Sequence, residues 1–419
     1  MAVERFRTPK GASDTLPEEQ RYWRFFQKTA EEAVARFGYS RIDTPMFEDA
    51  KLFIRTAGEI TDIVENETYT FEDRGGDMLT LRPEGTAPVC RSYLEHGMFN
   101  QPQPVRLHYF MPMFRYDRPQ AGRYRQLHQL GVEAIGDSDA SIDAEVIELA
   151  LSLLGMLGLT DLTLKLNSIG DPECRPHYIE KLRDYYRSQR IAHADCVRRL
   201  EENPLRLLDC KEKSCQRLIE KAPISADHLC EECEVHWNEL LGYLDSIAIP
   251  YEIDGGLVRG LDYYTRTVFE VEPAKELGQS TILGGGRYDG LIEQIGGAPT
   301  PGIGFGMGIE RVLLNLKRQG IEVSESGRIK VLVAHVGQDA KEAGLRIASS
   351  LRMGGVTAVL GPPGRSLKSQ MRYAASIGVS HAAILGKDEL ERGTVILRDL
   401  GQSTQVEVSA ADLISKLTV

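Results

Sequence analysis

The chain has 419 residues, a net charge of −11 and 42% apolar residues, values that are ordinary for a globular protein of about two to four domains. No apolar run reaches the roughly 18 residues of a membrane span, and the N-terminus lacks a signal-peptide core. We therefore expect a cytoplasmic protein that does not contact a membrane. Seven cysteines are too few for a disulfide-rich secreted domain, and the acidic charge excludes a uniformly basic nucleic-acid-binding surface but not local basic patches.

The N-terminal part of the chain mixes helical and strand-like periodicity. A glycine-containing turn separates two short strands, which favours a hairpin. Two longer strands flank a polar, basic loop, which favours a second hairpin. In chain order we expect a helix at 18–37, a strand at 39–43, hairpin strands at 68–72 and 78–82, a helix at 83–94, long strands at 104–117 and 126–135, a helix at 139–158 and a strand at 162–168.

From about 170 to 250 the sequence becomes helical, charged and cysteine-rich, which indicates an inserted helical subdomain. Strand patterns resume at Tyr251, continue through LVRGLDYYTRTVFEVE and STILGGGRYDG, and end in a strand at 302–308 followed by a helix. Residues 321–328 form a polar linker. Beyond it, strands and helices alternate, which predicts a small α/β domain with a largely parallel sheet. We place the two domains at 1–325 and 328–419.

The loop of the second hairpin carries clustered arginines: Arg115, Arg118, Arg123 and Arg125, with Gln120 among them. So many guanidinium groups repel one another unless an anion or carboxylates compensate, and their planar forks suit phosphate oxygens. The cluster favours a polyphosphate cradle, although a solvated hairpin tip is an alternative.

The strand GIGFGMG has glycine at every second position, so one of its faces carries no side chains. Such a face favours close approach by a flat base or a sugar, or by another element of the protein. Arg311 lies in the first turn of the following helix, where N–H groups favour anions.

Two further segments contain candidate pocket residues. LVRGLDYYTR holds Arg259, Tyr263 and Tyr264, and LGGGRYDG holds Tyr288. Taken singly, each tyrosine is more typical of a core than of a ligand contact.

The cysteines of the insertion give a weaker signal. Cys210 and Cys215, with Cys230 and Cys233, resemble paired zinc knuckles, and His228 and His236 are further candidates. The spacing is loose, however, and reduced, partly buried cysteines are the alternative. We assign no metal ligand and leave the question open.

Several motifs together resemble those of class II aminoacyl-tRNA synthetases. These are YSRIDTPMFED with its preceding helix, FRYDRPQAGRYRQLHQLGVEAIG, and GIGFGMGIERVLL. LVRGLDYYTRTVFE and GGGRYDGLIEQIGG further resemble the two signature segments of histidyl-tRNA synthetases. The resemblance runs in order from PKGASDTLP to the C-terminal α/β domain.

This resemblance implies an α+β catalytic domain, built on an antiparallel sheet flanked by helices, with a helical insertion. It also implies a C-terminal α/β anticodon-binding domain and a homodimer formed through residues 18–45. The implied reaction ligates L-histidine to tRNA(His) through a histidyl-adenylate, with ATP as substrate and Mg²⁺ as cofactor.

The resemblance also implies roles for individual residues. Arg259 and Arg115 would be catalytic. The nucleotide would contact Arg115, Arg123, Leu127, Arg311, Gly304 and Gly306. Histidine would contact Glu84, Gly85, Thr86, Gln129, Glu133, Arg259, Tyr263, Tyr264 and Tyr288. The tRNA acceptor end would meet Arg118 and Gln120. Leu127 departs from the family pattern, which usually has a phenylalanine that stacks on adenine.

Three alternatives compete with this interpretation: a non-catalytic regulatory subunit of ATP phosphoribosyltransferase, a synthetase for another amino acid, and a generic nucleotide-binding protein. Arg259, Arg311 and the C-terminal domain argue against the first, and Glu133 with Tyr264 argues against the second, because they suit an imidazole. Residues 328–419 hold twelve Lys/Arg and eight Asp/Glu, a net charge of +4 that fits an RNA loop. The candidate RNA contacts are Arg365, Lys368 and Arg372.

Overall fold

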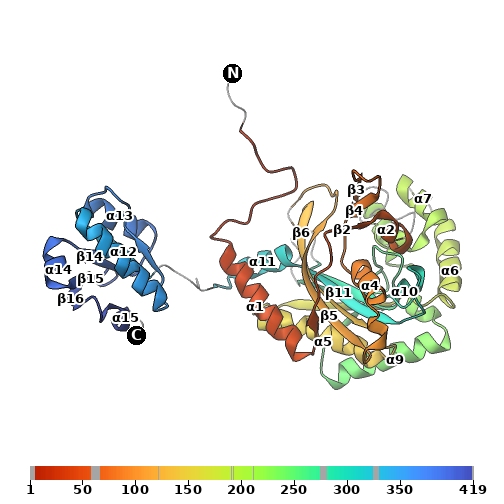
Figure 1. Cartoon of the computed structure of the whole chain (residues 1–419). Helices are drawn as coiled ribbons and strands as arrows, with labels where there is room; N and C mark the ends of the chain where they lie inside the picture. The colour runs from red at the N-terminus through yellow and green to blue at the C-terminus, as the bar shows by residue number, and fades with distance from the viewer. Residues whose placement is uncertain are drawn as a thin grey trace. The chain divides into compact units, whose positions relative to one another are not determined.

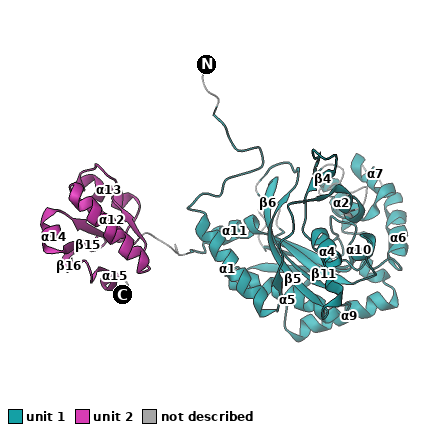
Figure 2. Ribbon diagram, in the orientation of Figure 1, with its two compact units in different colours: residues 1–323 teal, residues 324–419 magenta. Residues whose placement is uncertain are grey.

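The computed structural model describes residues 5–57, 67–120, 122–189, 191, 193–210, 212–273, 281–323 and 330–417. The chain divides into two compact units, Met1–Val323 and Ser324–Val419 (Figure 2). Most of the expected linker, residues 324–328, lies outside the described residues. None of the described helices combines the length and the apolar composition that a membrane crossing needs.

An eight-stranded sheet forms the centre of the larger unit (Figure 1). Its six inner strands pair antiparallel, and only the two edge strands pair parallel with their neighbours. The expected antiparallel catalytic fold is thus confirmed. The strands, in sheet order, are β1 (Ser40–Arg41), β5 (Val105–Phe114), β6 (Gln126–Ile135), β11 (Gly302–Gly308), β10 (Leu283–Arg287), β9 (Thr265–Pro273), β7 (Leu162–Ser168) and β8 (Glu252–Ile253).

Helices pack on both faces of this sheet. One face contributes to the main hydrophobic core, and the other carries the candidate site. On one face, apolar side chains that alternate along β6 and β11 form a single core with the long helices. The opposite face carries glycines and polar residues, with shorter helices and several tyrosines around them. The core-face helices are α1 (Gln20–Arg36), α5 (Ala140–Met156), α9 (Glu231–Ser246) and α11 (Ile309–Arg318); the others are α4 (Thr86–Glu95), η1 (Met98–Asn100) and α10 (Leu291–Gln294).

A small antiparallel sheet lies beside the large one. It contains β2 (Phe47–Asp49), β4 (Met78–Leu81) and β3 (Tyr69–Glu72), so the predicted first hairpin is confirmed. Helix α2 (Ala50–Ala57) follows β2 and was not predicted from the sequence.

The insertion is helical, as expected. Its elements are α6 (Arg175–Arg187), α7 (Ala194–Glu202), η2 (Pro204–Leu207), α8 (Lys213–Ile219) and η3 (Ser225–His228), and α9 returns the chain to the core.

The expected strand through LVRGLDYY is wrong, because β9 begins only at Thr265. Side chains, rather than the backbone of a neighbouring strand, donate hydrogen bonds to the carbonyl groups of this segment. Asn167 donates to the carbonyl of Leu257 at 2.9 Å, and Arg206 donates to that of Gly260 at 2.6 Å. The segment 257–264 is therefore a loop that the insertion holds in place.

The smaller unit contains a five-stranded sheet of order β13-β12-β14-β15-β16. The first three strands are parallel and the last two are antiparallel, because short connections cannot make a parallel crossover. The elements are β12 (Val331–His335), α12 (Gln338–Met353), β13 (Ala358–Leu360), α13 (Leu367–Ser376), β14 (His381–Leu385), α14 (Lys387–Arg392), β15 (Thr394–Asp399), β16 (Gln405–Ser409) and α15 (Leu413–Leu417).

Candidate active site

A cavity of about 940 Å³ opens on the glycine-bearing face of the large sheet. It collects residues from the β5–β6 hairpin, the 257–264 loop, β9–β11 and the start of α11. The predicted site residues that line it are Glu84, Thr86, Arg115, Gln120, Arg123, Leu127, Gln129, Arg259, Tyr263, Tyr264, Gly306 and Arg311. The predicted residues outside its lining are Gly85, Arg118, Glu133, Tyr288 and Gly304.

Two of the lining arginines are held by hydrogen bonds to backbone carbonyl groups. Arg115 donates through Nε to the carbonyl of Pro83 at 2.7 Å. Arg311 donates to two carbonyls, those of Gly122 at 2.9 Å and Thr281 at 2.7 Å. These bonds leave part of each guanidinium fork facing the cavity, in the manner of a preorganised anion site.

The positive charges of these arginines repel one another, and this repulsion affects the pKa of Arg311. Burial lowers the pKa of Arg311, and the positive charges of Arg115 and Arg123 lower it further. The positive charge of Arg123 is partly compensated by Asp117, whose Oδ1 lies 3.3 Å from Arg123 Nη1. A bound polyanion would relieve the remaining repulsion, as the sequence predicted for this loop.

Arg259 lines the same cavity. Burial opposes its charge, but Glu270, with which Nη1 forms an ion pair, raises its pKa. Its guanidinium also lies 5.7 Å from the centre of the Tyr264 ring. Gly284 permits this placement, because a Cβ at that position would overlap the guanidinium. Arg259 is thus fixed and charged where it meets the cavity.

A buried carboxylate marks the deep end of the site. Glu133 is 1% exposed and accepts hydrogen bonds from the hydroxyl groups of Thr86 at 2.8 Å, Tyr109 at 3.2 Å and Tyr288 at 2.6 Å. Burial raises the pKa of Glu133 to about 8, although these three donors oppose the rise. Such a group can hold or release a proton near neutral pH, which suits an imidazole ligand.

The glycine face of β11 is mostly filled by the protein itself. A Cβ at Gly304 would overlap the Glu133 carboxylate, and one at Gly302 would overlap the Tyr288 ring. The Glu133 side chain of β6 therefore occupies the space beside Gly304, and a nucleotide contact at Gly304 stays a prediction. Gly306 does line the cavity, next to Gln129.

Glu84, Gln129 and the tyrosines complete the pocket. Glu84 accepts from the backbone N–H groups of Thr86 and Ala87 at 2.6 and 2.9 Å, at the start of α4. Burial raises the pKa of Glu84 despite these bonds. The buried Oε1 of Gln129 has no hydrogen-bond partner among the described residues. An orphaned buried oxygen beside a cavity indicates a ligand donor that belongs there.

The tyrosine rings pack together at this end. Tyr263 lies 4.8 Å from Tyr264 and 6.1 Å from Tyr288, measured between ring centres. Gly85 contributes space rather than a contact, because a Cβ there would overlap Tyr109. Arg118 is exposed on the hairpin loop, whereas Gln120 reaches the cavity rim.

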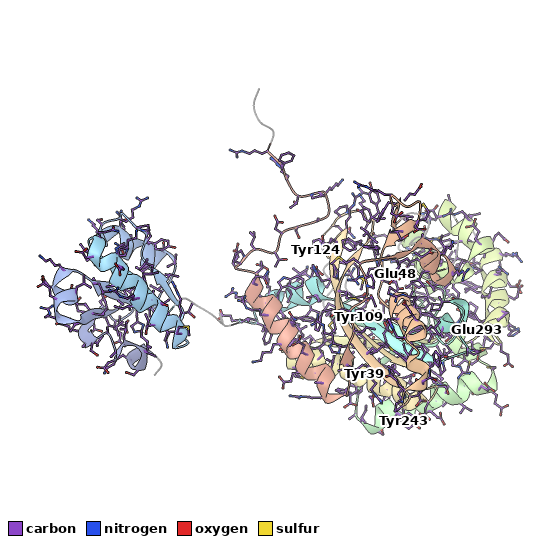
Figure 3. All side chains as sticks on the ribbon, in the orientation of Figure 1. Tyr39, Glu48, Tyr109, Tyr124, Tyr243 and Glu293 are labelled. Atoms are coloured by element: carbon purple, nitrogen blue, oxygen red, sulfur yellow. The ribbon has the colours of Figure 1, made fainter. Side chains whose placement is uncertain are left out.

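Sequence reasoning missed several lining residues, notably Tyr109, Tyr124 and Glu270. Figure 3 shows Tyr109 in the interior of the larger unit and Tyr124 toward the β5–β6 loop. The signal for Tyr109 was present: it lies opposite Gly131 in the β5–β6 register, and glycine opposite an aromatic residue leaves room for its ring.

We expect replacement of Glu133 by glutamine to change how stability depends on pH. Because the folded-state pKa is raised to about 8, Glu133 stabilises the fold when protonated, and this contribution is lost as pH rises from about 4.5 to 8. Glu133→Gln keeps the hydrogen-bonding shape but does not titrate. Its free energy of unfolding relative to wild type should rise by roughly 1–4 kcal/mol between about pH 5 and pH 8. Urea unfolding at the two pH values measures this, and a pH-independent difference would contradict it.

The comparisons with known proteins agree with the geometry. The sequence matches the family described as Histidyl-tRNA synthetase over residues 11–312 and the Anticodon binding domain over residues 330–419. The Histidine--tRNA ligase of Dehalococcoides mccartyi strain 195 is 53% identical over 413 residues, covering 98% of this chain and 99% of that protein. That of Halothermothrix orenii is 48% identical over 413 residues, covering 98% of each.

A solved structure extends the match to three dimensions. The crystal structure of apo histidyl-tRNA synthetase from S. aureus has a TM-score of 0.83 and 35% sequence identity, over 99% of this chain and 100% of that chain. The likeness therefore spans the arginine-lined cavity, the helical insertion and the C-terminal unit together. On this evidence the chain belongs to the histidyl-tRNA synthetase family.

Proposed function

We propose that this chain ligates L-histidine to tRNA(His) at the expense of ATP, through a histidyl-adenylate. One observation carries the proposal: Arg115, Arg259 and Arg311 line a single cavity, and Thr86, which also lines it, donates a hydrogen bond to the buried carboxylate of Glu133 just behind. Full-length similarity to Histidine--tRNA ligases favours the enzyme over the regulatory-subunit alternative. ATP–pyrophosphate exchange that depends on added histidine tests this proposal.

In the first step a carboxylate oxygen of histidine attacks the α-phosphorus of ATP, and the bond to the β-phosphate bridging oxygen breaks. The nucleophile is already an anion, so no general base is needed. Catalysis then rests on alignment and on neutralising charge as it moves onto the leaving pyrophosphate. We assign Arg115 to the α-phosphate, Arg123 and Arg311 to the outer phosphates, and Arg259 to both the histidine carboxylate and the α-phosphate.

Histidine would occupy the deep end of the cavity. Glu84, Thr86 and Gln129 would hold its α-amino group, and the orphaned Oε1 of Gln129 supports this assignment. Glu133, with Tyr264 and Tyr288, would recognise the imidazole, while Tyr263 lines the pocket. Three hydroxyl groups donate to the Glu133 carboxylate, Thr86 and Tyr109 to Oε1 and Tyr288 to Oε2. A carboxylate has about four acceptor positions, so one remains for an imidazole N–H.

The cavity also offers suitable oxygens for Mg²⁺. Glu270 and Glu272 line its wall near Arg311, and carboxylates are ligands that this hard cation prefers. Bound with ATP, the ion would neutralise phosphate charge. The two carboxylates already accept from the Thr281 hydroxyl at 2.8 and 3.2 Å, which fixes their orientation.

Leu127 is expected to weaken the contact with adenine. It is a partly buried, cavity-lining residue, so it can cover the base with apolar surface but cannot stack on it. Aromatic stacking adds about 0.5–1.5 kcal/mol, so Leu127→Phe should bind ATP about two- to tenfold more tightly than wild type. Calorimetric titration with ATP measures this, and equal dissociation constants would contradict it.

In the second step the terminal ribose hydroxyl of the tRNA attacks the mixed anhydride, transferring histidine and releasing AMP. Arg118 and Gln120, on the cavity-side hairpin loop, would meet the acceptor end. The C-terminal unit would contact the anticodon, where Arg365, Lys368 and Arg372 are exposed at and before α13. Because it charges tRNA, we place the protein in the cytoplasm.

We further propose a homodimer, supported by an apolar face of the small sheet. Cross-strand register puts the apolar residues Phe47, Tyr69, Phe71, Leu79 and Leu81 on one side of β2, β3 and β4, with Asp49 at the end of β2 on the same side. The two phenylalanines are 51% and 43% exposed. A contiguous exposed apolar face of this kind is typical of an interface.

Replacing both Phe47 and Phe71 with aspartate should convert the dimer to a monomer, because two buried charges would be unpaired at the interface. Light scattering coupled to size-exclusion chromatography measures the mass. Val406→Asp alters an equally exposed valine of the other unit and should leave the dimer intact. A wild-type monomer, or a dimeric double variant, would contradict the proposal.

A further inference from the structure

Six of the seven cysteines gather in two clusters that the ligation reaction does not use. Each cluster contains four side chains of metal-ligating type, and within each cluster the ligand atoms all lie within 4.8 Å of one another. The first cluster is His193, Cys196, Cys210 and Cys215, and the second is Asp171, Cys174, Cys230 and Cys233.

The first cluster has the dimensions of a tetrahedral zinc site. With Zn–S near 2.3 Å and Zn–N near 2.0 Å, neighbouring ligand atoms of a tetrahedron stand about 3.5–3.8 Å apart. Here Cys196 Sγ lies 3.6 Å from Cys215 Sγ, and His193 Nδ1 lies 3.3 Å from Cys196 Sγ and 3.7 Å from Cys210 Sγ. Its three cysteines are buried, so the site is closed to solvent on that side.

The second cluster has similar spacing with one oxygen ligand. Asp171 Oδ1 lies 3.6 Å from Cys174 Sγ and 3.9 Å from Cys230 Sγ, and Cys233 is buried beside them. The backbone N–H groups of Glu173 and Cys174 also hold this oxygen, at 3.0 and 3.3 Å. Such bonds orient a carboxylate ligand from outside the metal shell.

Disulfide bonding does not explain either cluster. All seven cysteines are free, and the 3.6 Å between the sulfurs of Cys196 and Cys215 far exceeds the roughly 2.05 Å of a disulfide bond. Packing alone would not require a histidine and an aspartate to point at the thiols.

The clusters also correct the ligand pairing suggested by the sequence. Cys210 and Cys215 do not share a site with Cys230 and Cys233. Neither suggested histidine is a ligand: His236 Nε2 lies 2.9 Å from Asp143, and His228 stacks on Tyr178 with ring centres 6.1 Å apart.

We propose that each cluster binds one structural Zn²⁺ ion. Four protein ligands leave no open coordination position, which is the arrangement of structural rather than catalytic zinc. Binding replaces each thiol proton with a bond to the metal and releases that proton to solvent, three per site. Neither ion takes part in adenylate chemistry, so the proposal is independent of the function proposed above.

The two ions would hold the loop that carries Arg259 at its middle and at its C-terminal end. Beside the first cluster, Arg206 donates to the carbonyl of Gly260 at 2.6 Å, and Asn203 donates to Asp262 at 3.2 Å. Beside the second, Arg175 donates to the carbonyl of Tyr264 at 2.6 Å. Asp209 and Gln216, adjacent to cluster residues, line the catalytic cavity itself.

Elemental analysis of the purified full chain by inductively coupled plasma mass spectrometry tests the proposal. Wild type should carry about two zinc ions per chain and no iron. Cys210→Ser and Cys233→Ser should each carry about one, and the double variant close to none. Cys90→Ser changes the one cysteine outside both clusters and should keep two. His228→Ala should also keep two.

The same experiment can overturn the proposal. A wild-type ratio near zero removes both sites, and iron with acid-labile sulfide replaces zinc by an iron–sulfur cluster. If either single serine variant keeps the wild-type ratio of zinc to chain, zinc binding by the cluster that contains the replaced cysteine is contradicted.

X-ray absorption at the zinc edge of the wild-type protein does not depend on the variants folding. It should show sulfur-dominated shells near 2.3 Å, and a shell of light atoms alone would overturn the assignment.

Zinc removal by a chelator should raise the KM for histidine severalfold in pyrophosphate exchange, and added Zn²⁺ should reverse the change. An unchanged KM in demonstrably zinc-free protein would overturn the role in holding the 257–264 loop.

Discussion

Replacement of Arg259 by alanine is expected to reduce histidine-dependent ATP–pyrophosphate exchange by about 10²–10³-fold, mainly in kcat. Arg259 is a charged side chain, fixed by Glu270 and Tyr264, that lines the same cavity as Arg115 and Arg311. Alanine removes both the charge and the alignment that the first step requires. It also leaves Glu270 unpaired, which places a negative charge beside the phosphates.

Two controls separate this loss from unfolding. Arg259→Lys keeps the charge without the planar fork and should retain more exchange than alanine but less than wild type. Arg372→Ala removes an exposed arginine of the other unit and should leave exchange unchanged. Thermal unfolding of each variant reports on the fold. Exchange by a folded Arg259→Ala variant within a few-fold of wild type would show that the assignment is wrong.

Removal of the C-terminal unit, by ending the chain at Val323, should weaken tRNA charging by at least about 10²-fold and exchange only severalfold. The larger unit has its own core and contains the whole lined cavity. Exchange needs only histidine, ATP and pyrophosphate, whereas charging also needs affinity for tRNA, to which phosphate contacts contribute strongly.

The comparison of two rates in one preparation makes this prediction specific. Aminoacylation with tRNA(His) and pyrophosphate exchange are measured at the same concentration of truncated protein, and light scattering checks its oligomeric state. Equal loss of both activities would mean that the unit supports folding or dimerisation of the larger unit rather than tRNA binding.

Local periodicity predicted most of the fold. The strands at 126–135 and 302–308 were located to the residue because polar and apolar positions alternate along them. The loop 257–264 was mistaken for a strand because its aromatic and apolar composition is typical of strands. What makes it a loop is nonlocal: Asn167 of β7 and Arg206 of the insertion donate hydrogen bonds to its carbonyl groups.

The site shows the same division between local and nonlocal signals. Clustered arginines predicted a charged wall of the cavity, because their charge requires compensation wherever they fold, and Arg115, Arg123 and Arg311 do line it. The sequence of β11 alone did not show that the space beside Gly304 is filled, because the residue that fills it, Glu133, lies on another strand. The histidine and aspartate of the two cysteine clusters were missed because each cluster joins near and distant residues. His193 lies 3 residues from Cys196 but 17 from Cys210, and Asp171 lies 3 residues from Cys174 but 59 from Cys230.

ATP–pyrophosphate exchange by the full chain, with each of the twenty amino acids in turn, tests most directly whether the chain activates histidine. The cavity joins a polyphosphate cradle to a pocket whose buried carboxylate and tyrosine hydroxyls suit an imidazole. Histidine alone should therefore support exchange at a rate well above background. Equal exchange with another amino acid, or none with histidine in folded protein, would contradict the central claim.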